Sequence, residues 1–201
     1  MIYSDIDRDD WMIPEFIDFC QKLFPVIDPY TKEQAKRAMM QFEDNNGPFL
    51  SQETDSFDLF QGDIFSEMPF LYTNEKGQVK VIKRKAQLLS NTCDASRDPF
   101  LLFAAVHPLE DFQDNQPMVD GIVRNTKYSA FYLPDRILKN EFVDFGLINS
   151  IPREVFLKFQ EEKKVKRIAS LTLVGYYMFL CKLTVFFMRP EDIDVNTSRV
   201  Y

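Results

Sequence analysis

Residues 83–91, KRKAQLLSN, and residues 92–108, TCDASRDPFLLFAAVHP, decide how this chain folds. Two apolar runs, AQLLS and FLLFAAV, lie on either side of a segment rich in Asn, Asp, Ser and Pro. Short apolar runs joined by turn-forming residues are typical of neighbouring strands in a β-hairpin. The stretch therefore predicts an antiparallel pair of strands, opened by a basic cluster and closed by the only histidine of the chain.

The register of this hairpin follows from aligning the two apolar runs. If Leu88 lies opposite Phe103, then Arg84 of the basic cluster lies opposite His107. Opposed side chains in an antiparallel pair have Cβ atoms about 4.5–5.5 Å apart. The register therefore predicts that Arg84 and His107 lie side by side at one end of the hairpin.

The same alternation of short apolar runs and turn residues extends over most of the chain from Gln61 onward. Each further run predicts a strand: GDIFSEMPFLYT at 62–73, VKVI at 79–82, YSAFYLP at 128–134 and EFVDFGLINS at 141–150. After them, Pro152 is placed to begin a helix over PREVFLKFQEEKKVKR. Several short strands at this spacing, followed by helices, predict an α+β protein built on a small β-barrel or sandwich.

The first sixty residues have a different composition. Residues 11–24 place apolar side chains at helical spacing, and TKEQ at 31–34 matches a capping box that opens a second helix. Residues 1–60 carry 13 Asp/Glu and 5 Lys/Arg, a net charge of −8, whereas residues 61–201 carry 18 and 19, a net charge of +1. The chain thus divides into an acidic helical segment and a second domain. The acidic segment is either a solvated helical cap or a segment that covers a cleft for a polyanion.

The apolar stretch at residues 168–188 is long enough to span a bilayer. Lys182 lies well inside it, however, and a lysine at mid-membrane costs about 2.5–3.5 kcal/mol on insertion scales. Apolar side chains also recur along the stretch at helical spacing. We therefore expect a buried C-terminal helix rather than a membrane span.

Composition and motifs exclude several functional classes. The chain has 6 glycines and contains neither GxxxxGK[ST] nor GxGxxG, the patterns that cradle nucleotide phosphates. Its three cysteines are far apart and its single histidine adds no partner, so no metal site and no cofactor are expected. The acidic N-terminus lacks the apolar core of a signal peptide, and separated thiols fit a reducing compartment. These features predict a cytoplasmic protein.

Several segments, taken in order, resemble the MazF/PemK toxin family over residues 61–190. Gly62-Asp63-Ile64 is similar to the family's opening strand, and KRKAQLLS is similar to its xRPAxVxS strand, with Lys85 in place of the proline. FLLFAAVHPL is similar to the strand that follows, and EFVDFGLINSIPRE to a later strand that runs into a basic residue. MFLCKLTVFFM is similar to the closing helix.

This resemblance implies an SH3-like small β-barrel with a C-terminal helix, arranged as a homodimer. Members of the family cleave single-stranded RNA, and antitoxins bind them through acidic, partly helical segments. In the family, the arginine at the Arg84 position works beside a threonine at the end of the next strand, where this chain has His107. The family's residue pair is therefore not intact, and residues 1–60 have no counterpart in it.

Arg84 and His107 are the candidate catalytic residues. Cleavage of RNA by its own 2′-hydroxyl needs a base, an acid and positive charge beside the phosphate. A histidine, with a pKa near 6.5, suits proton transfer at neutral pH, and the planar fork of an arginine matches a phosphate. The alternative is a structural histidine that hydrogen-bonds to a neighbour at a strand end.

Four charged side chains near the strand ends are candidate substrate-binding residues: Lys83, Lys85, Asp63 and Asp94. The lysines would contact phosphates, or else form a solvated basic face. The aspartates would bind substrate or exchange protons, although an aspartate in a surface turn is the commoner case. A nucleophilic pair of Cys93 and His107 is disfavoured, because the tip of the hairpin loop lies far from the strand ends.

Two functions follow from these alternatives. The first is a toxin-like endoribonuclease that acts on single-stranded RNA and is restrained by its own acidic helices. The second is a non-catalytic MazF-like module that binds a protein partner in a toxin–antitoxin or phage-defence system. An enzyme needs Arg84 and His107 in one exposed cleft, whereas a module allows a buried His107 or an Arg84 held in an ion pair.

Overall fold

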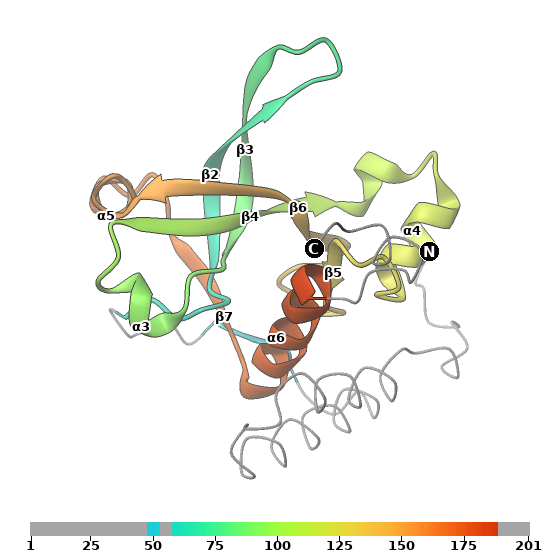
Figure 1. Ribbon diagram of the computed structural model, residues 1–201. Coiled ribbons are helices and arrows are strands. Elements are labelled where there is room, and N and C mark those ends of the chain that lie inside the picture. Colours follow the sequence, from blue (N-terminus) through green and yellow to red (C-terminus); the bar gives the residue numbers. More distant parts are fainter. Residues whose placement is uncertain (1–47, 53–57, 189–201) are drawn as a thin grey trace, which may run out of the picture.

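The computed structural model describes residues 48–52 and 58–188, which form an α+β fold (Figure 1). Seven antiparallel strands make one sheet in the order β1-β7-β2-β3-β4-β6-β5. The strands are β1 (Leu50–Ser51), β2 (Ile64–Thr73), β3 (Val79–Leu88), β4 (Phe100–Pro108), β5 (Ala130–Tyr132), β6 (Glu141–Pro152) and β7 (Arg167–Leu171). The helices are α3 (Thr92–Ala95), the 3-10 turn η2 (Leu109–Phe112), α4 (Gln116–Val123), α5 (Arg153–Glu161) and α6 (Leu173–Met188). The two helices predicted before residue 48 lie outside the described residues.

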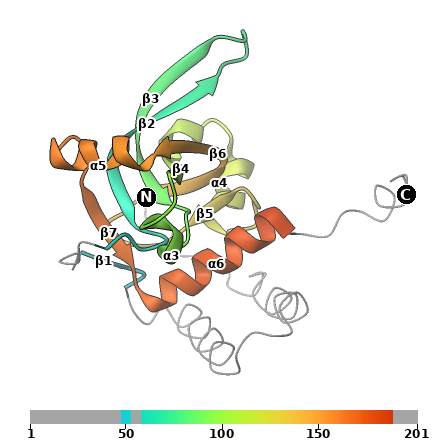
Figure 2. The same cartoon turned by 60° about the vertical axis from the view of Figure 1, so that its left-hand side comes forward.

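The sheet is open, which corrects the prediction of an SH3-like small β-barrel. β1 and β5 are its outermost strands, and no pairing joins them in the described part of the chain. They have only two and three residues, too few to complete a ring of strands. Helix α6 lies against one face of the sheet instead, as Figure 2 shows.

The register predicted for the central hairpin is confirmed, since Leu88 pairs with Phe103. Pairing between β3 and β4 stops at Ala86, because the first part of β3 turns away and pairs only with β2. Arg84 therefore lies opposite Met68 of β2, and no strand pairing joins it to His107.

Beyond the sheet, β2 and β3 continue as a two-stranded arm, residues 69–83, which protrudes from the molecule (Figures 1 and 2). A bulge at its base, where Glu67 has a φ of 50°, shifts the register between Phe65 and Met68. The Asn149 side chain on β6 accepts from the Leu71 N–H at 2.6 Å and donates to the Leu71 carbonyl at 3.2 Å. This one amide takes the place of a neighbouring strand at the base of the arm.

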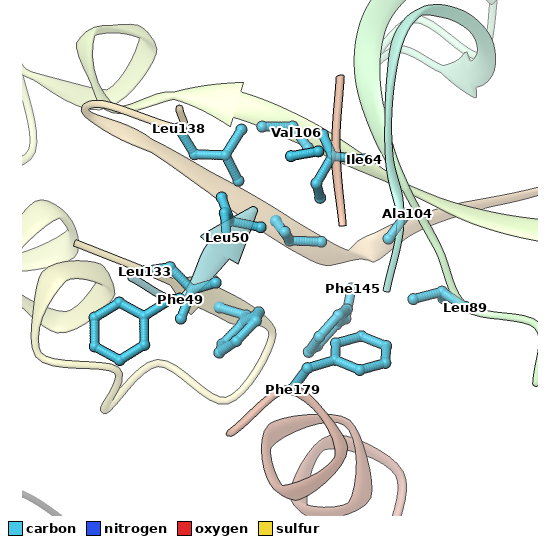
Figure 3. Packing of buried hydrophobic residues seen from close by; sticks show 13 residues of the cluster. Phe49, Leu50, Ile64, Leu89, Ala104, Val106, Leu133, Leu138, Phe145 and Phe179 are labelled. Carbon is cyan, nitrogen blue, oxygen red and sulfur yellow. The ribbon is translucent and has the colours of Figure 1, made fainter. Parts of the chain in front are cut away.

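Three clusters of buried apolar side chains hold these elements together. The first packs α6 against the sheet, where the rings of Phe145 and Phe179 are 6.2 Å apart (Figure 3). The second packs α5 against β2 and β4, where Phe156 meets Phe65 and Phe103. The third joins η2, α4 and β5 to β6, and so fixes the segment that follows His107.

The predicted C-terminal helix is present as α6, but it begins at Leu173, and residues 167–171 form strand β7 instead. The Thr172 hydroxyl accepts from the Gly175 N–H at 3.3 Å and so caps the first turn of the helix. Gly175 is needed there because an added Cβ would lie 2.2 Å from the carbonyl oxygen of Phe49. No helix in the described ranges is long and apolar enough to cross a membrane.

The segments on either side of β6 differ in how well the sequence predicted them. Helix α5 begins directly after Pro152, as expected, with Pro152 just outside the helix rather than in its first turn. The segment from Leu109 to Val123, which the sequence pattern left unassigned, holds η2 and α4. This unassigned segment turns out to contribute to the candidate site.

Candidate functional site

Four charged or titratable side chains converge where β3 parts from β4: Arg84 on β3, His107 on β4, Asp111 in η2 and Asp144 on β6. Arg84 Nη2 is 3.0 Å from Asp111 Oδ2, and the same oxygen is 3.9 Å from His107 Nδ1. His107 Nε2 is 3.9 Å from Asp144 Oδ2. The four side chains thus form a row in which a basic group and an acidic group alternate.

The local fold explains this convergence. Phe142 of β6 lies opposite His107, and Asp144, two residues along the same strand, faces the same side of the sheet. Asp111 follows His107 by four residues, and the turn η2 brings it back beside the imidazole. The Phe112 ring in the same turn packs on Phe142, with centroids 5.5 Å apart, and holds η2 in place.

The His107 ring is largely buried, with its side chain 13% exposed. Burial is the main cause that lowers the pKa of His107; Asp144 and Asp111 raise the pKa, and Arg84 lowers it further. The imidazole is therefore neutral at pH 7. At 3.9 Å neither carboxylate is within hydrogen-bond distance, and Nε2 is buried with no hydrogen-bond partner among the described residues.

Arg84 is more accessible. Its side chain is 35% exposed and that of its partner Asp111 is 37% exposed. An ion pair this exposed contributes roughly 0–1 kcal/mol to stability, so it opens at low cost. Opening it would leave a guanidinium group and a neutral imidazole on either side of one vacated position, which is an arrangement suited to an anion with a proton to be moved.

The two predicted lysines lie next to this site. Lys83 is exposed on the arm, one residue before Arg84. Lys85 is half-buried, and its Nζ is 2.6 Å from Glu141 Oε2. Lys83 is therefore the lysine of this pair that has no ion-pair partner among the described residues.

The two predicted aspartates lie elsewhere. Asp63 directly precedes β2, whereas Met68, the residue opposite Arg84, lies in the middle of that strand. Asp63 is fully buried; it binds Arg167 at 2.9 Å and accepts from the Ser170 hydroxyl at 2.6 Å. Asp94 is half-buried on α3, where it pairs with Arg97 at 2.7 Å. The structure therefore joins neither aspartate to Arg84 and His107, and it gives Asp63 a structural role between β2 and β7.

The described residues also bear on the nucleophile and metal alternatives. Cys93 is exposed in α3, which precedes β4, whereas His107 lies near the other end of that strand. The structure does not bring the two together. No group of three or more His, Cys, Asp or Glu side chains in the described residues could hold a metal ion.

A hollow of about 410 Å³ adjoins the row of four side chains. Pro108, Leu109 and Glu110, which directly follow His107, line one side of it, and Glu141, the partner of Lys85, lines another. Because its lining carries two carboxylates against the single Lys139, the hollow itself does not attract a phosphate. The groups that attract an anion lie beside it, at Arg84.

Sequence reasoning missed Asp111 and Asp144. Asp111 lies in HPLED, four residues after the only histidine, and this spacing was a usable signal. Asp144 interrupts the apolar strand EFVDFGL, but only the register between β4 and β6 shows that it faces His107. The sequence therefore held one local clue and no long-range clue.

No model of a protein family matches the sequence, and no curated protein matches it. The structure is similar to a MazE-MazF crystal structure. That structure is Form-II of MazE-MazF from Deinococcus radiodurans, and the match covers 66% of this chain and 99% of that chain, with 11% sequence identity and a TM-score of 0.37.

Proposed function

We propose that this chain is a MazF-like endoribonuclease that acts on single-stranded RNA. The observation that carries the proposal is the single Asp111 oxygen, 3.0 Å from Arg84 and 3.9 Å from His107. A phosphate oxygen carries the same sign of charge and is of similar size, so it would occupy this position once Asp111 moves aside. Arg84 and the neutral His107 would then flank one phosphodiester.

In the proposed reaction, neutral His107 takes the proton of the 2′-hydroxyl, and the 2′ oxygen forms a bond to phosphorus. The bond from phosphorus to the 5′ oxygen breaks, and this oxygen takes the proton from the imidazolium. Arg84 stabilises the charge on the non-bridging oxygens. Asp144, 3.9 Å from Nε2, stabilises the imidazolium between the two proton transfers. The products are a 2′,3′-cyclic phosphate and a 5′-hydroxyl.

In this proposal the enzyme is restrained in two ways. Asp111 occupies the guanidinium of Arg84, and the part of the acidic segment, residues 1–60, that precedes β1 covers the cleft that RNA would enter. The proposed partners of the catalytic domain, residues 61–201, are therefore single-stranded RNA, a second copy of the chain, and an acidic antitoxin or a similar protein. The net charge of −8 in residues 1–60 supports this restraint.

A second candidate function, the non-catalytic interaction module, is favoured by two observations. His107 is largely buried, and Arg84 is held in an ion pair. In a module the row of four side chains would only stabilise the end of β4, and a protein partner would bind elsewhere on the sheet.

The two functions separate in a growth and RNA-integrity experiment in bacteria. It compares the full chain, residues 48–201, and residues 48–201 carrying His107→Ala. The truncation begins at residue 48 because Phe49 and Leu50 are buried in the core. We expect residues 48–201 to arrest growth and cut RNA, the full chain to do so less, and His107→Ala to be harmless.

Matched arginine variants complete this test. Arg84→Ala removes the proposed phosphate ligand, and Arg97→Ala removes an exposed arginine that also pairs with an aspartate, at 2.7 Å, outside the site. We expect Arg84→Ala to abolish RNA cleavage and Arg97→Ala to leave it unchanged. If RNA stays whole with every form, the endoribonuclease proposal is wrong and the module remains.

A further inference from the structure

The arm exposes a row of aliphatic side chains. Leu71 pairs with Val81, and the next pair along the arm, Thr73 and Val79, faces the same side. The exposed fractions of Leu71, Val79 and Val81 are 57, 67 and 63%. Aliphatic side chains that are this exposed, and grouped on one face of a protruding element, mark a contact surface.

The arm is also basic. Residues 69–85 contain five Lys/Arg and one Glu. Arg84 and Lys85 at the base form ion pairs with Asp111 and Glu141, whereas Lys76, Lys80 and Lys83 have no ion-pair partner among the described residues. Lysines on an exposed strand oppose pairing with a second copy of the same strand. The occupant that this surface fits is therefore acidic, and it is not another arm.

A nucleic acid fits the aliphatic row less well than a polypeptide does. Proteins bind single strands by stacking bases on aromatic side chains. Tyr72, 38% exposed, is the only accessible aromatic group on the arm, because Phe70 is fully buried. Stacked bases would leave the aliphatic groups uncovered, whereas apolar side chains of a polypeptide would bury them.

The chain itself supplies an acidic polypeptide with apolar side chains. Residues 1–47 contain ten Asp/Glu and five Lys/Arg, and residues 11–24 repeat apolar side chains at helical spacing. The described residues begin at Pro48. A stretch of 47 residues spans about 70 Å even as a continuous helix, against about 40 Å for a domain of this size. The segment is long enough to reach any part of the surface.

We propose that residues 1–47 dock on the aliphatic row of the arm. Apolar side chains of the segment cover Leu71, Val79 and Val81, and its carboxylates meet Lys83, which shares the face of the row, and Lys76 at the tip of the arm. Lys83 follows Val81 on the face of the row, and the next residue, Arg84, points to the other face, so a segment docked along the row ends at the part of β3 that carries the candidate site. This inference rests on the proposed function, because it says where the acidic segment that restrains the enzyme binds. Docking is measured without RNA, so the docking proposal and the endoribonuclease proposal can fail independently.

The test places a photo-crosslinking residue, p-benzoylphenylalanine, at position 81 of the full chain. The purified protein is treated with nuclease before irradiation. The matched control carries it at Val155, an exposed valine of α5 (40%) outside the arm. Isotopically light and heavy chains are mixed before irradiation, so that mass spectrometry separates links within one molecule from links between two. We expect links from position 81 to residues 1–47 of the same molecule. We expect no such links from position 155.

A second measurement addresses the surface without a bulky probe. Leu71→Ser with Val81→Ser removes exposed side chains of the arm and leaves the three buried clusters intact. We expect faster hydrogen exchange in residues 1–47 of this variant than in the parent chain. The inference is overturned if position 81 links only to a second molecule or to retained RNA, if it yields no link to residues 1–47, or if exchange there is unchanged.

Discussion

Asp111 is the residue that pairs with the Arg84 guanidinium. Its Oδ2 atom lies 3.0 Å from the guanidinium, and both side chains are about one-third exposed. An ion pair of this kind competes directly with a phosphate for the same donors. In the proposed enzyme, access of a substrate phosphate to Arg84 would therefore depend on this one carboxylate.

Asp111→Asn tests this competition. The amide keeps the shape of the side chain and removes its charge, so we expect a single-stranded deoxyoligonucleotide, which lacks the 2′-hydroxyl and is not cleaved, to bind roughly three- to tenfold more tightly, or about 1 kcal/mol. Fluorescence anisotropy of the full chain measures this change. Asp94→Asn, which frees Arg97 outside the site, is the control; equal gains in both variants would point to net charge alone.

His107 is the only histidine, so its ring protons are assigned without ambiguity in an NMR titration. We expect a pKa below 6.5, because burial is the largest effect on the ring, and a further decrease in Asp144→Asn, because Asp144 raises the pKa. A pKa at or above 6.5 would contradict the buried, neutral imidazole. An increase in the pKa of His107 in Asp144→Asn would contradict the interaction between His107 and Asp144.

The lowered pKa of His107 also affects folding stability. Between the folded pKa and about 6.5 the unfolded chain binds a proton that the folded chain does not, so the free energy of unfolding falls as the pH drops through this window. We expect His107→Gln to show a smaller fall over the same window in urea unfolding. Parallel curves for the two proteins would assign the pH dependence to other groups.

At the scale of elements, the contact between α6 and β1 depends on Gly175. An added Cβ would lie 2.2 Å from the Phe49 carbonyl oxygen, so Gly175→Ala must displace the helix or the strand. We expect a loss of stability of about 2 kcal/mol or more in urea unfolding. Gly121→Ala in α4 is the matched control, since its nearest neighbour would be 3.5 Å away. Alanine forms helices better than glycine, so we expect Gly121→Ala to leave the free energy of unfolding unchanged or to raise it by about 0.5 kcal/mol.

Lys182 joins α6 to the end of α4, where its Nζ donates to the Asn125 carbonyl. Burial lowers the pKa of Lys182 to about 8. Between pH 8 and about 10.4 the unfolded chain binds more protons than the folded chain, so this group makes the protein more stable as the pH rises. We expect the melting temperature of the parent chain, relative to that of Lys182→Met, to increase from pH 7.5 to pH 9.5. A constant difference would show that the ammonium group is solvated.

The elements differ in how far the sequence predicted them. The β3–β4 register was predictable because two apolar runs flank one loop, and a slip by one residue would turn every side chain to the wrong face. Strand β7 was not, because RIASL merges with the apolar helix that follows. The open edge of the sheet was not predictable either, since it depends on how short β1 and β5 are. Arg84 and His107 were placed together, but their carboxylate partners come from a turn and a strand that only the tertiary fold brings near.

At the scale of the whole molecule, charge limits how strongly a nucleic acid binds. Several cations of the described part, Arg84, Lys85, Arg97, Lys164 and Arg167, already form ion pairs. If binding uses the three arm lysines, log K should fall with log salt with a slope of about −2, at roughly 0.7 per phosphate. Anisotropy of residues 48–201, which lack the segment proposed to dock on the arm, measures this slope between low and high salt. A much steeper slope would require a larger basic surface elsewhere.

The Asn149 amide that grips Leu71 has a mechanical consequence. Below this grip the arm is anchored to β6, and above it the two strands have only each other, with the Glu67 bulge beneath. The point at which the arm is anchored, Leu71, lies on the same strand as Met68, the residue opposite Arg84. We expect a load on the tip to reach the backbone that carries the Arg84 guanidinium, and so to strain the Arg84–Asp111 ion pair.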